Sequence, residues 1–262
     1  MIAAAGRGER LGSPDNKAFV LLNGKPLASY ALDAILASGA IDEVVVVVAP
    51  ADVERARRVF LADAGAVRHA VTVKIAAGGD QRQVSVRAGL DEVNPGCDFV
   101  LVHDAARPFL RADLIRRCLE GAVKHGAVVA AAPTTDTVKE VDPEGAVIGT
   151  LDRSRLWLVQ TPQVFRYQLL VEAHRLAAET SFSGTDDAAL VEQMGHRVHV
   201  VLGDADNIKI TWHEDLRRAE RYLCNWKDKA GREMAFRSGI GYDAHVFQEG
   251  RPLVLAGVRF PG

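Results

Sequence analysis

The sequence has few of the features that identify several large classes of protein. It contains only three cysteines, Cys97, Cys118 and Cys224, which lie far apart and form no CxxC pair. We therefore expect reduced, mostly buried thiols with no disulfide or metal role. No apolar run approaches the ~18 residues that a membrane span needs. No signal peptide precedes the first glycines, so we expect a cytoplasmic protein that makes no contact with membranes.

An excess of charge of one sign is also missing. The 32 basic and 34 acidic residues leave a formal net charge of -2, which argues against a surface built for nucleic acid or anionic membranes. Any anion site must therefore be local. With 48% apolar and 25% charged residues, the composition is typical of a globular protein with one full core.

Strand-like and helix-like stretches alternate along the chain. Five consecutive valines within 43–49 show no polar alternation, which is typical of a strand covered on both faces. Further strands are predicted at 71–77, 99–106, 127–133 and 197–203, and helices at 27–38, 52–64, 81–93, 114–125, 167–180 and 186–194. This order predicts an α/β fold with a Rossmann-like, open, mostly parallel twisted sheet and helices on both faces. Ligands of such sheets bind beyond the carboxyl ends of the strands.

Two segments break this alternation. Residues 136–153 alternate polar and apolar side chains around a "DPEG" turn, which predicts a protruding β-hairpin arm. Because an isolated two-stranded ribbon is marginal in water, we expect the arm to pack on another surface, such as a second subunit. Near the end, a linker is expected at 226–236, and residues 237–262 are too few to bury a core alone.

The stretch "MIAAAGRGERLGSPDNK" places a glycine-rich loop directly after the first predicted strand. Gly6, Gly8 and Gly12 lack the spacing of a dinucleotide fingerprint, and a Walker A motif is absent. A third interpretation is a nucleoside triphosphate cradle, in which backbone N–H groups approach phosphates and Arg10 and Lys17 neutralise charge. A plain strand–helix turn with solvated cations is the alternative.

The stretch "GGDQRQVSV" follows a later strand and opens a helix. Gly78 and Gly79 allow a close approach of the backbone, to a base or a ribose. Asp80 can cap the helix and Ser85 is expected to point inward, although a plain N-cap without a ligand is the alternative.

The stretch "VHDAARP" ends a strand that is predicted to be buried. A carboxylate at this position, Asp104, suits a Mg²⁺ ion that bridges phosphates. An ion pair between Asp104 and Arg107 that closes the loop is the alternative.

Eight motifs occur in the order and approximate spacing of the 2-C-methyl-D-erythritol 4-phosphate cytidylyltransferase family: "AAAGRGERLG…K", "GGDQRQVSV", "LVHDAARP", "DTVK", "LDRSRLW", "QTPQVF", "TDDAALVE" and "DNIKIT". The resemblance covers roughly residues 1–225. It implies a homodimeric nucleotidyltransferase with the nucleotide-diphospho-sugar transferase type of fold. Such an enzyme uses Mg²⁺ to join CTP to 2-C-methyl-D-erythritol 4-phosphate, releasing pyrophosphate, in non-mevalonate isoprenoid biosynthesis.

The resemblance also implies roles for individual residues. The implied catalytic cations are Arg10, Lys17, Arg153 and Lys209. The implied nucleotide-binding residues are Ala4, Ala5, Gly6, Gly8, Gly78, Gly79, Asp80, Ser85, Asp104 and Ala105, with Asp104 as the Mg²⁺ ligand. Contacts to the acceptor are implied for Arg107, Thr137, Arg153 and Thr185, of which Thr137 and Arg153 belong to the arm that reaches into the partner's site. Asn16 and Ala18 flank Lys17 where the family usually has proline and glutamine.

The last residues resemble another family. The pattern "IGYDAHVF…PLVLAGVRFP" is similar to the start of 2-C-methyl-D-erythritol 2,4-cyclodiphosphate synthase, a zinc enzyme. Asp243 and His245 match its first two metal ligands, and residues two apart on a strand share a face. Because the third metal-binding histidine and the remainder of that domain are missing, we expect no cyclase activity. The chain resembles a piece of a longer bifunctional protein.

Two alternative functions stay open on the sequence. One is another sugar- or polyol-phosphate cytidylyltransferase, for example one that acts on ribitol 5-phosphate, since the phosphate cradle would be the same. The other is a nucleotide-binding module without catalysis. The identity of the acceptor distinguishes the first alternative from the function that the resemblance implies. The presence or absence of turnover distinguishes the second.

Overall fold

A mixed seven-stranded sheet organises most of the described chain, with the strand order β11-β7-β10-β6-β1-β4-β5. The computed structural model describes residues 1–6, 8–11, 15–61, 71–229, 253–255 and 258–260. These fall into two compact units, Met1–Leu223 and Cys224–Gly262. The strands of the sheet are β1 (Ile2–Ala4), β4 (Glu43–Val48), β5 (Thr72–Ala77), β6 (Phe99–Asp104), β7 (Ala127–Pro133), β10 (Trp157–Arg166) and β11 (His199–Leu202).

The sheet is parallel except at β10, which confirms the expected open, mostly parallel architecture. β10 pairs antiparallel with both β6 and β7, and its register shifts between Val159 and Gln163. The sequence analysis predicted no strand here. Gln160, Thr161 and Gln163 are nevertheless buried, so this strand carries polar side chains into the interior and lacks the apolar run of its neighbours.

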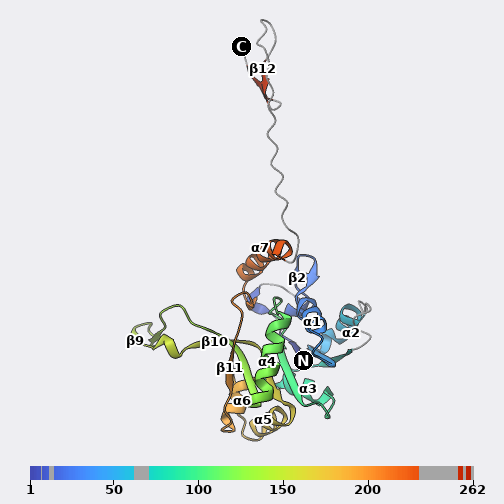
Figure 1. Cartoon of the computed structure of the whole chain (residues 1–262), viewed down its shortest axis with the longest axis vertical. Coiled ribbons are helices and arrows are strands. Elements are labelled where there is room, and N and C mark those ends of the chain that lie inside the picture. Colours follow the sequence, from blue (N-terminus) through green and yellow to red (C-terminus); the bar gives the residue numbers. More distant parts are fainter. Residues whose placement is uncertain (7, 12–14, 62–70, 230–252, 256–257, 261–262) are drawn as a thin grey trace. The chain divides into compact units, whose positions relative to one another are not determined.

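Helices cover both faces of the sheet, as the valine run of β4 predicted (Figure 1). Val44, Val46 and Val48 belong to the core on one face, whereas Val45 and Val47 belong to the core on the other. The first face carries α1 (Leu27–Ala37), α2 (Val53–Ala56) with its π-helical continuation Arg57–Leu61, and α4 (Ala112–His125). The second face carries α3 (Arg82–Glu92), α5 (Tyr167–Glu179) and α6 (Asp187–Gln193).

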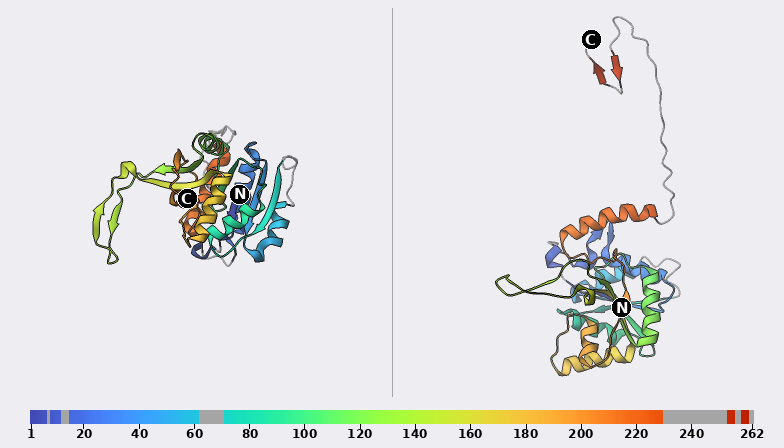
Figure 2. Two further views of the ribbon diagram at one scale, coloured as in Figure 1. Left: turned by 90° about the horizontal axis from the view of Figure 1, so that it is seen from below. Right: turned by 60° about the vertical axis from the view of Figure 1, so that its left-hand side comes forward.

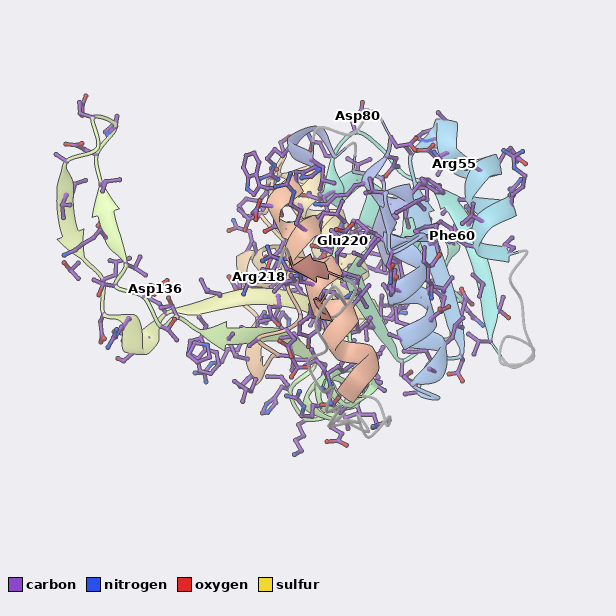
Figure 3. The ribbon with its side chains drawn as sticks, turned by 90° about the horizontal axis from the view of Figure 1, so that it is seen from above. Arg55, Phe60, Asp80, Asp136, Arg218 and Glu220 are labelled. Carbon is purple, nitrogen blue, oxygen red and sulfur yellow. The ribbon has the colours of Figure 1, made fainter. Side chains whose placement is uncertain are left out.

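The predicted arm is a hairpin of β8 (Lys139–Val141) and β9 (Val147–Thr150) that projects from the body (Figure 2). Asp136 marks its base in Figure 3. At its turn, Gly145 has a φ of 87°, a conformation that glycine adopts without strain. The side chains of Val141, Val147 and Ile148 are 52%, 60% and 64% exposed, so the arm presents apolar surface to its surroundings.

A smaller third core lies under α7 (His213–Lys229), where Leu27, Phe109 and Ile210 pack with residues of that helix. The remaining short elements are β2 (Leu21–Leu22), β3 (Lys25–Pro26) and the 3₁₀ turns Glu9–Leu11, Lys17–Phe19, Pro50–Asp52 and Arg153–Arg155. None of the helices in the described ranges is long and apolar enough to cross a membrane.

The start of the expected linker at 226–236 is helical, because α7 continues to Lys229. In the second unit, β12 (Leu253–Leu255) pairs antiparallel with β13 (Val258–Phe260). The two metal ligands that the resemblance implied, Asp243 and His245, lie outside the described residues.

Gly89 allows α3 to lie close to β4, and this contact yields a stability prediction. A Cβ atom at this position would lie 2.6 Å from Cγ2 of Val47. Alanine is normally preferred to glycine in a helix by about 1 kcal/mol, but overpacking a core costs about 1–3 kcal/mol. We therefore expect Gly89→Ala to lower the free energy of unfolding in urea titrations by up to about 2 kcal/mol.

The matched control for Gly89→Ala is Arg87→Gln on the same helix. The Arg87 side chain is 42% exposed, and its replacement should change the stability by less than about 0.5 kcal/mol. An increase in stability for Gly89→Ala would contradict the close packing of α3 on β4.

Candidate active site

A cleft of about 670 Å³ lies beyond the carboxyl ends of β1, β5 and β6. Segments that are distant in the sequence meet here because the parallel strands all point toward this edge of the sheet. Twelve of the residues predicted for the site line the cleft: Ala4, Ala5, Gly6, Gly8, Arg10, Lys17, Gly79, Asp80, Ser85, Asp104, Ala105 and Lys209.

The glycine-rich loop folds back so that Lys17 lies against its start. The backbone N–H of Lys17 donates to the carbonyl of Gly6 at 3.3 Å. Gly8 has a φ of +69°, and a Cβ there would lie 3.1 Å from Cβ of Lys17. A side chain at position 8 would therefore meet both backbone strain and crowding, which explains the glycine.

Asn16 fixes the segment just before Lys17. Its side-chain oxygen accepts a hydrogen bond from the backbone N–H of Ala18 at 3.0 Å, and its amide nitrogen donates to Asp52 at 2.8 Å. These two hydrogen bonds hold the backbone of the turn, and the residue that forms them, Asn16, stands where the sequence analysis placed the family's usual proline. Lys17 is thereby presented to the cleft from an anchored turn.

Lys17 has an unusual electrostatic environment. Burial lowers the pKa of its ammonium group to about 8, and the nearby charges of Lys209 and Arg10 act in the same direction. Arg10 itself lies over the ring of Trp212, with 5.8 Å between the guanidinium carbon and the ring centroid. This contact orders the cation without neutralising its charge.

Asp104 has a cation against each oxygen of its carboxylate. Nζ of Lys209 lies 2.7 Å from Oδ2, and Nε of Arg82 lies 3.2 Å from Oδ1. Burial alone would raise the pKa of this carboxyl, but the charges of Arg82 and Lys209 outweigh it and hold the pKa well below its usual range. Asp104 is therefore a carboxylate at neutral pH.

The double glycine and Ser85 form one unit. The Ser85 hydroxyl is within 3.1 Å of the backbone N–H and carbonyl of Gly79, and a Cβ on Gly78 would lie 2.7 Å from that hydroxyl oxygen. Ser85 therefore shapes the loop, as well as lining the cleft. Asp80 is not the N-cap of α3; that position belongs to Gln81. Asp80 lies at the edge of the molecule in the view of Figure 3.

Arg107 does not line the cleft among the described residues. Its guanidinium donates to the carbonyl of Asn207 at 2.7 Å and to that of Val159 at 3.4 Å. It therefore joins three segments of the chain, and no ion pair between Arg107 and Asp104 is formed among the described residues. The acceptor contact implied for Arg107 stays a prediction.

The other predicted acceptor contacts are likewise not part of the lining of the chain's own cleft. Thr137 and Arg153 belong to the projecting arm, where Arg153 donates to the carbonyl of Thr135 at 2.9 Å. Thr185 is exposed just before α6. Gly78 lies behind the cleft lining, under Ser85.

Arg82 was missed by the sequence analysis, although it belongs to a quoted motif. It lines the cleft and contacts both Asp104 and Asp187. The signal was present in the spacing: Arg82 lies three residues before Ser85 on the same helix, so the two side chains share one face. If Ser85 points inward, Arg82 must do so as well.

The described residues contain no group of three or more histidine, cysteine, aspartate or glutamate side chains that could hold a metal ion. The described lining of the cleft instead offers two carboxylates, Asp80 and Asp104, beside several cations. That set suits a Mg²⁺ ion that completes its shell with water and substrate phosphates, as such ions usually do.

The sheet, the glycine-rich loop and the cation-lined cleft define an α/β nucleotidyltransferase. The family model for IspD, 2-C-methyl-D-erythritol 4-phosphate cytidylyltransferase, matches residues 1–225. The chain therefore belongs to the 2-C-methyl-D-erythritol 4-phosphate cytidylyltransferase family.

Individual relatives agree with the family model. The chain is 39% identical over 235 residues to a 2-C-methyl-D-erythritol 4-phosphate cytidylyltransferase of Alkaliphilus metalliredigens, covering 87% of this chain and 96% of that protein. It is 41% identical over its whole length to a bifunctional enzyme IspD/IspF of Desulforudis audaxviator, of which it spans 63%. A crystal structure of 4-diphosphocytidyl-2C-methyl-D-erythritol synthase from Anaerococcus prevotii superposes with a TM-score of 0.74 at 30% identity, covering 85% of this chain and 96% of that one.

The lowered pKa of Lys17 predicts how triphosphate binding depends on pH. Below about pH 8 the group is protonated and attracts phosphate; above that value it loses its charge. We expect the affinity for CTP, measured by calorimetry with EDTA present, to fall up to about 10-fold from about pH 7 to about pH 9.

The matched control for this titration is Lys17→Arg, since arginine keeps its charge over the same range. That variant should show a flat profile. An equally steep profile in Lys17→Arg would assign the titration to another group.

Proposed function

We propose that this chain transfers CMP from CTP to 2-C-methyl-D-erythritol 4-phosphate and releases pyrophosphate. The supporting observation is the cleft at the carboxyl edge of the sheet, where a glycine-rich loop, Arg10, Lys17, Lys209 and Asp104 converge. The proposed identities of the nucleotide and of the acceptor are inferred from membership of the family. A cytoplasmic setting for this reaction stays a prediction of the sequence.

The chemistry requires two polyanions to meet. A phosphate oxygen of the acceptor attacks the α-phosphorus of CTP, the P–O bond to the leaving pyrophosphate breaks, and the oxygen keeps the electron pair. The attacking oxygen is already an anion at neutral pH, so the reaction needs no covalent nucleophile from the protein. Positioning and charge stabilisation supply the rate. In this proposal, Arg10, Lys17 and Lys209 stabilise the charge that develops on the α-phosphate and on pyrophosphate.

Asp104 is the residue of the cleft that would hold Mg²⁺. Its carboxylate is ionised, and Lys209, which is 43% exposed, can leave one oxygen for a ligand phosphate. A bound Mg²⁺ ion would supply positive charge that neutralises the phosphates. The protein's part is to keep one carboxylate charged and oriented among the cations.

For the acceptor, we propose that the arm of a second copy completes each cleft. Thr137 and Arg153 lie on the arm, outside the lining of the chain's own cleft. Exposed apolar side chains run from the arm onto β10, where Trp157, Leu158 and Val159 are 40%, 62% and 46% exposed. A surface of this kind is typical of a contact between subunits.

The first test of this function is the pair of variants Lys17→Ala and Arg10→Ala. Losing one preorganised charge stabiliser typically lowers turnover by about 10²–10³-fold. We expect a loss of that size in pyrophosphate release, with unchanged thermal unfolding. The control is Lys25→Ala, which removes a lysine that pairs with Asp33 and lies outside the cleft lining. Undiminished turnover in either cleft variant would contradict the assigned roles.

The acceptor is tested by a panel assay with CTP and Mg²⁺. We expect pyrophosphate release with 2-C-methyl-D-erythritol 4-phosphate and much less with ribitol 5-phosphate or other polyol phosphates. Release only with another polyol phosphate would favour a different cytidylyltransferase. Binding of CTP without turnover on any acceptor would favour a nucleotide-binding module.

Mixing two inactive variants tests the contribution of the partner's arm. Co-expressed Lys17→Ala and Arg153→Ala chains would form mixed dimers in which one site combines an intact core with an intact arm. Random pairing then restores about a quarter of the sites. If the mixture stays as inactive as its parents, the arm does not act on the partner's site.

We also propose that residues 237–262 correspond to the start of a cyclodiphosphate synthase domain. The support is that the bifunctional relative from Desulforudis audaxviator matches the whole chain, although the chain spans only 63% of that enzyme. Asp243 and His245 would then belong to a zinc site that needs further ligands.

A further inference from the structure

Arg82 connects the cleft to the protein interior, a position for which the proposed reaction assigns no task. It is the first residue of α3. Its Nε donates to Oδ1 of Asp104 at 3.2 Å, and its Nη1 donates to Oδ2 of Asp187 at 2.7 Å. One guanidinium therefore joins a carboxylate of the cleft to a carboxylate of the core.

The interior end of this connection is held firmly. The side chain of Asp187 is 1% exposed, and its Oδ1 lies 3.2 Å from Nε2 of His174, which is also 1% exposed. Asp187 is the first residue of α6, where the helix dipole favours a negative charge. The carboxylate that binds Arg82 is therefore held between α5 and α6 and is almost completely buried.

At the cleft end of this connection, the carboxylate of Asp104 lies between two cations that differ in exposure and in their other partners. Lys209 is 43% exposed, and Asp104 is its one ion-pair partner among the described residues. Arg82 is only 29% exposed and is tied to a second carboxylate. Because a guanidinium is planar and donates in fixed directions, it orients its partner, whereas a lysine ammonium is a mobile point charge.

From this geometry we propose that Arg82 is a positioning residue. Braced by Asp187 and His174, it fixes the orientation of the Asp104 carboxylate toward a divalent metal that accompanies the nucleotide. The proposal rests on the proposed function for the presence of a metal-bound nucleotide. When a ligand binds, Lys209 releases the carboxylate oxygen of Asp104 that it contacts, whereas the hydrogen bond from Arg82 to Asp104 remains.

Few carboxylates are at hand, which makes orientation important. The described residues contain no group of three or more potential metal ligands, and among the described cleft residues Asp80 is the one carboxylate besides Asp104. Residues that orient a metal ligand typically contribute about 10–100-fold to metal affinity, even though they never touch the metal. Arg82 also joins α3, α6 and β6, so a purely structural role is the competing explanation.

The two explanations predict different results in a calorimetric titration of the intact chain. CTP is titrated into the protein with EDTA and again with saturating Mg²⁺, and the ratio of the two affinities gives the metal-dependent gain. We expect Arg82→Gln to reduce this gain about 10–100-fold while the affinity in EDTA stays near that of the unsubstituted chain. Asp187→Asn, which leaves every cleft side chain in place, should reduce the gain in the same direction.

The matched control is Arg87→Gln, which removes a guanidinium from the same helix where it pairs only with Asp91 among the described side chains. This variant should keep the full metal-dependent gain. Arg82→Lys keeps the positive charge but loses the planar guanidinium, so its metal-dependent gain should lie between those of Arg82→Gln and the unsubstituted chain. This variant also tests the proposal if Arg82→Gln is poorly folded.

The proposal is overturned if folded Arg82→Gln or Arg82→Lys keeps the full gain, or if the affinity falls equally with and without Mg²⁺. It is also overturned if the unsubstituted chain gains nothing from Mg²⁺. These titrations contain no acceptor. A failure of the acceptor panel would therefore refute the proposed reaction and leave the role of Arg82 to be judged separately.

Discussion

Asp104 lies at the end of a buried strand with a cation against each of its carboxylate oxygens, Lys209 at 2.7 Å and Arg82 at 3.2 Å. Removing a carboxylate from water is costly unless opposite charges and hydrogen bonds replace the lost hydration. Here they do, and the pKa of Asp104 lies well below its usual range despite the burial. The remainder of the cleft is arranged around this fixed negative charge.

The sheet is what brings these groups to one place. β6 pairs with β1 on one side and β10 on the other, so Asp104 sits between the glycine-rich loop and the middle of β10. Thr161 on β10 accepts a hydrogen bond from the backbone N–H of Asp104 at 3.0 Å, and Asn207 donates to the carbonyl of Thr161 at 2.7 Å. This buried polar network leads directly into the segment that carries Lys209. The polar residues that made β10 hard to predict from the sequence are therefore the ones that connect the site to the sheet.

Much of the fold could be predicted because the signals are local. The run of valines in β4, the alternating helices and strands, and the arm turn each lie within a short window. β10 could not be predicted in this way, since its stability depends on partners that lie far away in the sequence. The hydrogen bonds of Arg107 could not be predicted for the same reason: its acceptors, Val159 and Asn207, are 52 and 100 residues away, and a motif does not show which way a side chain turns.

The cations of the cleft differ in how much of their charge is already balanced. Arg82 and Lys209 are matched by Asp187 and Asp104, so together these four side chains carry no net charge. Arg10 rests on an aromatic ring, and burial, together with the nearby charges of Lys209 and Arg10, lowers the pKa of Lys17 to about 8. Among the described residues neither Arg10 nor Lys17 forms an ion pair with a carboxylate, although Asp104 and Asp215 offset part of the repulsion at Lys17. Under the proposed function, a bound triphosphate would relieve the repulsion among these cations, and this relief would contribute to its binding. Under the proposed function, Arg82 supplies geometry, whereas Arg10, Lys17 and a released Lys209 supply charge.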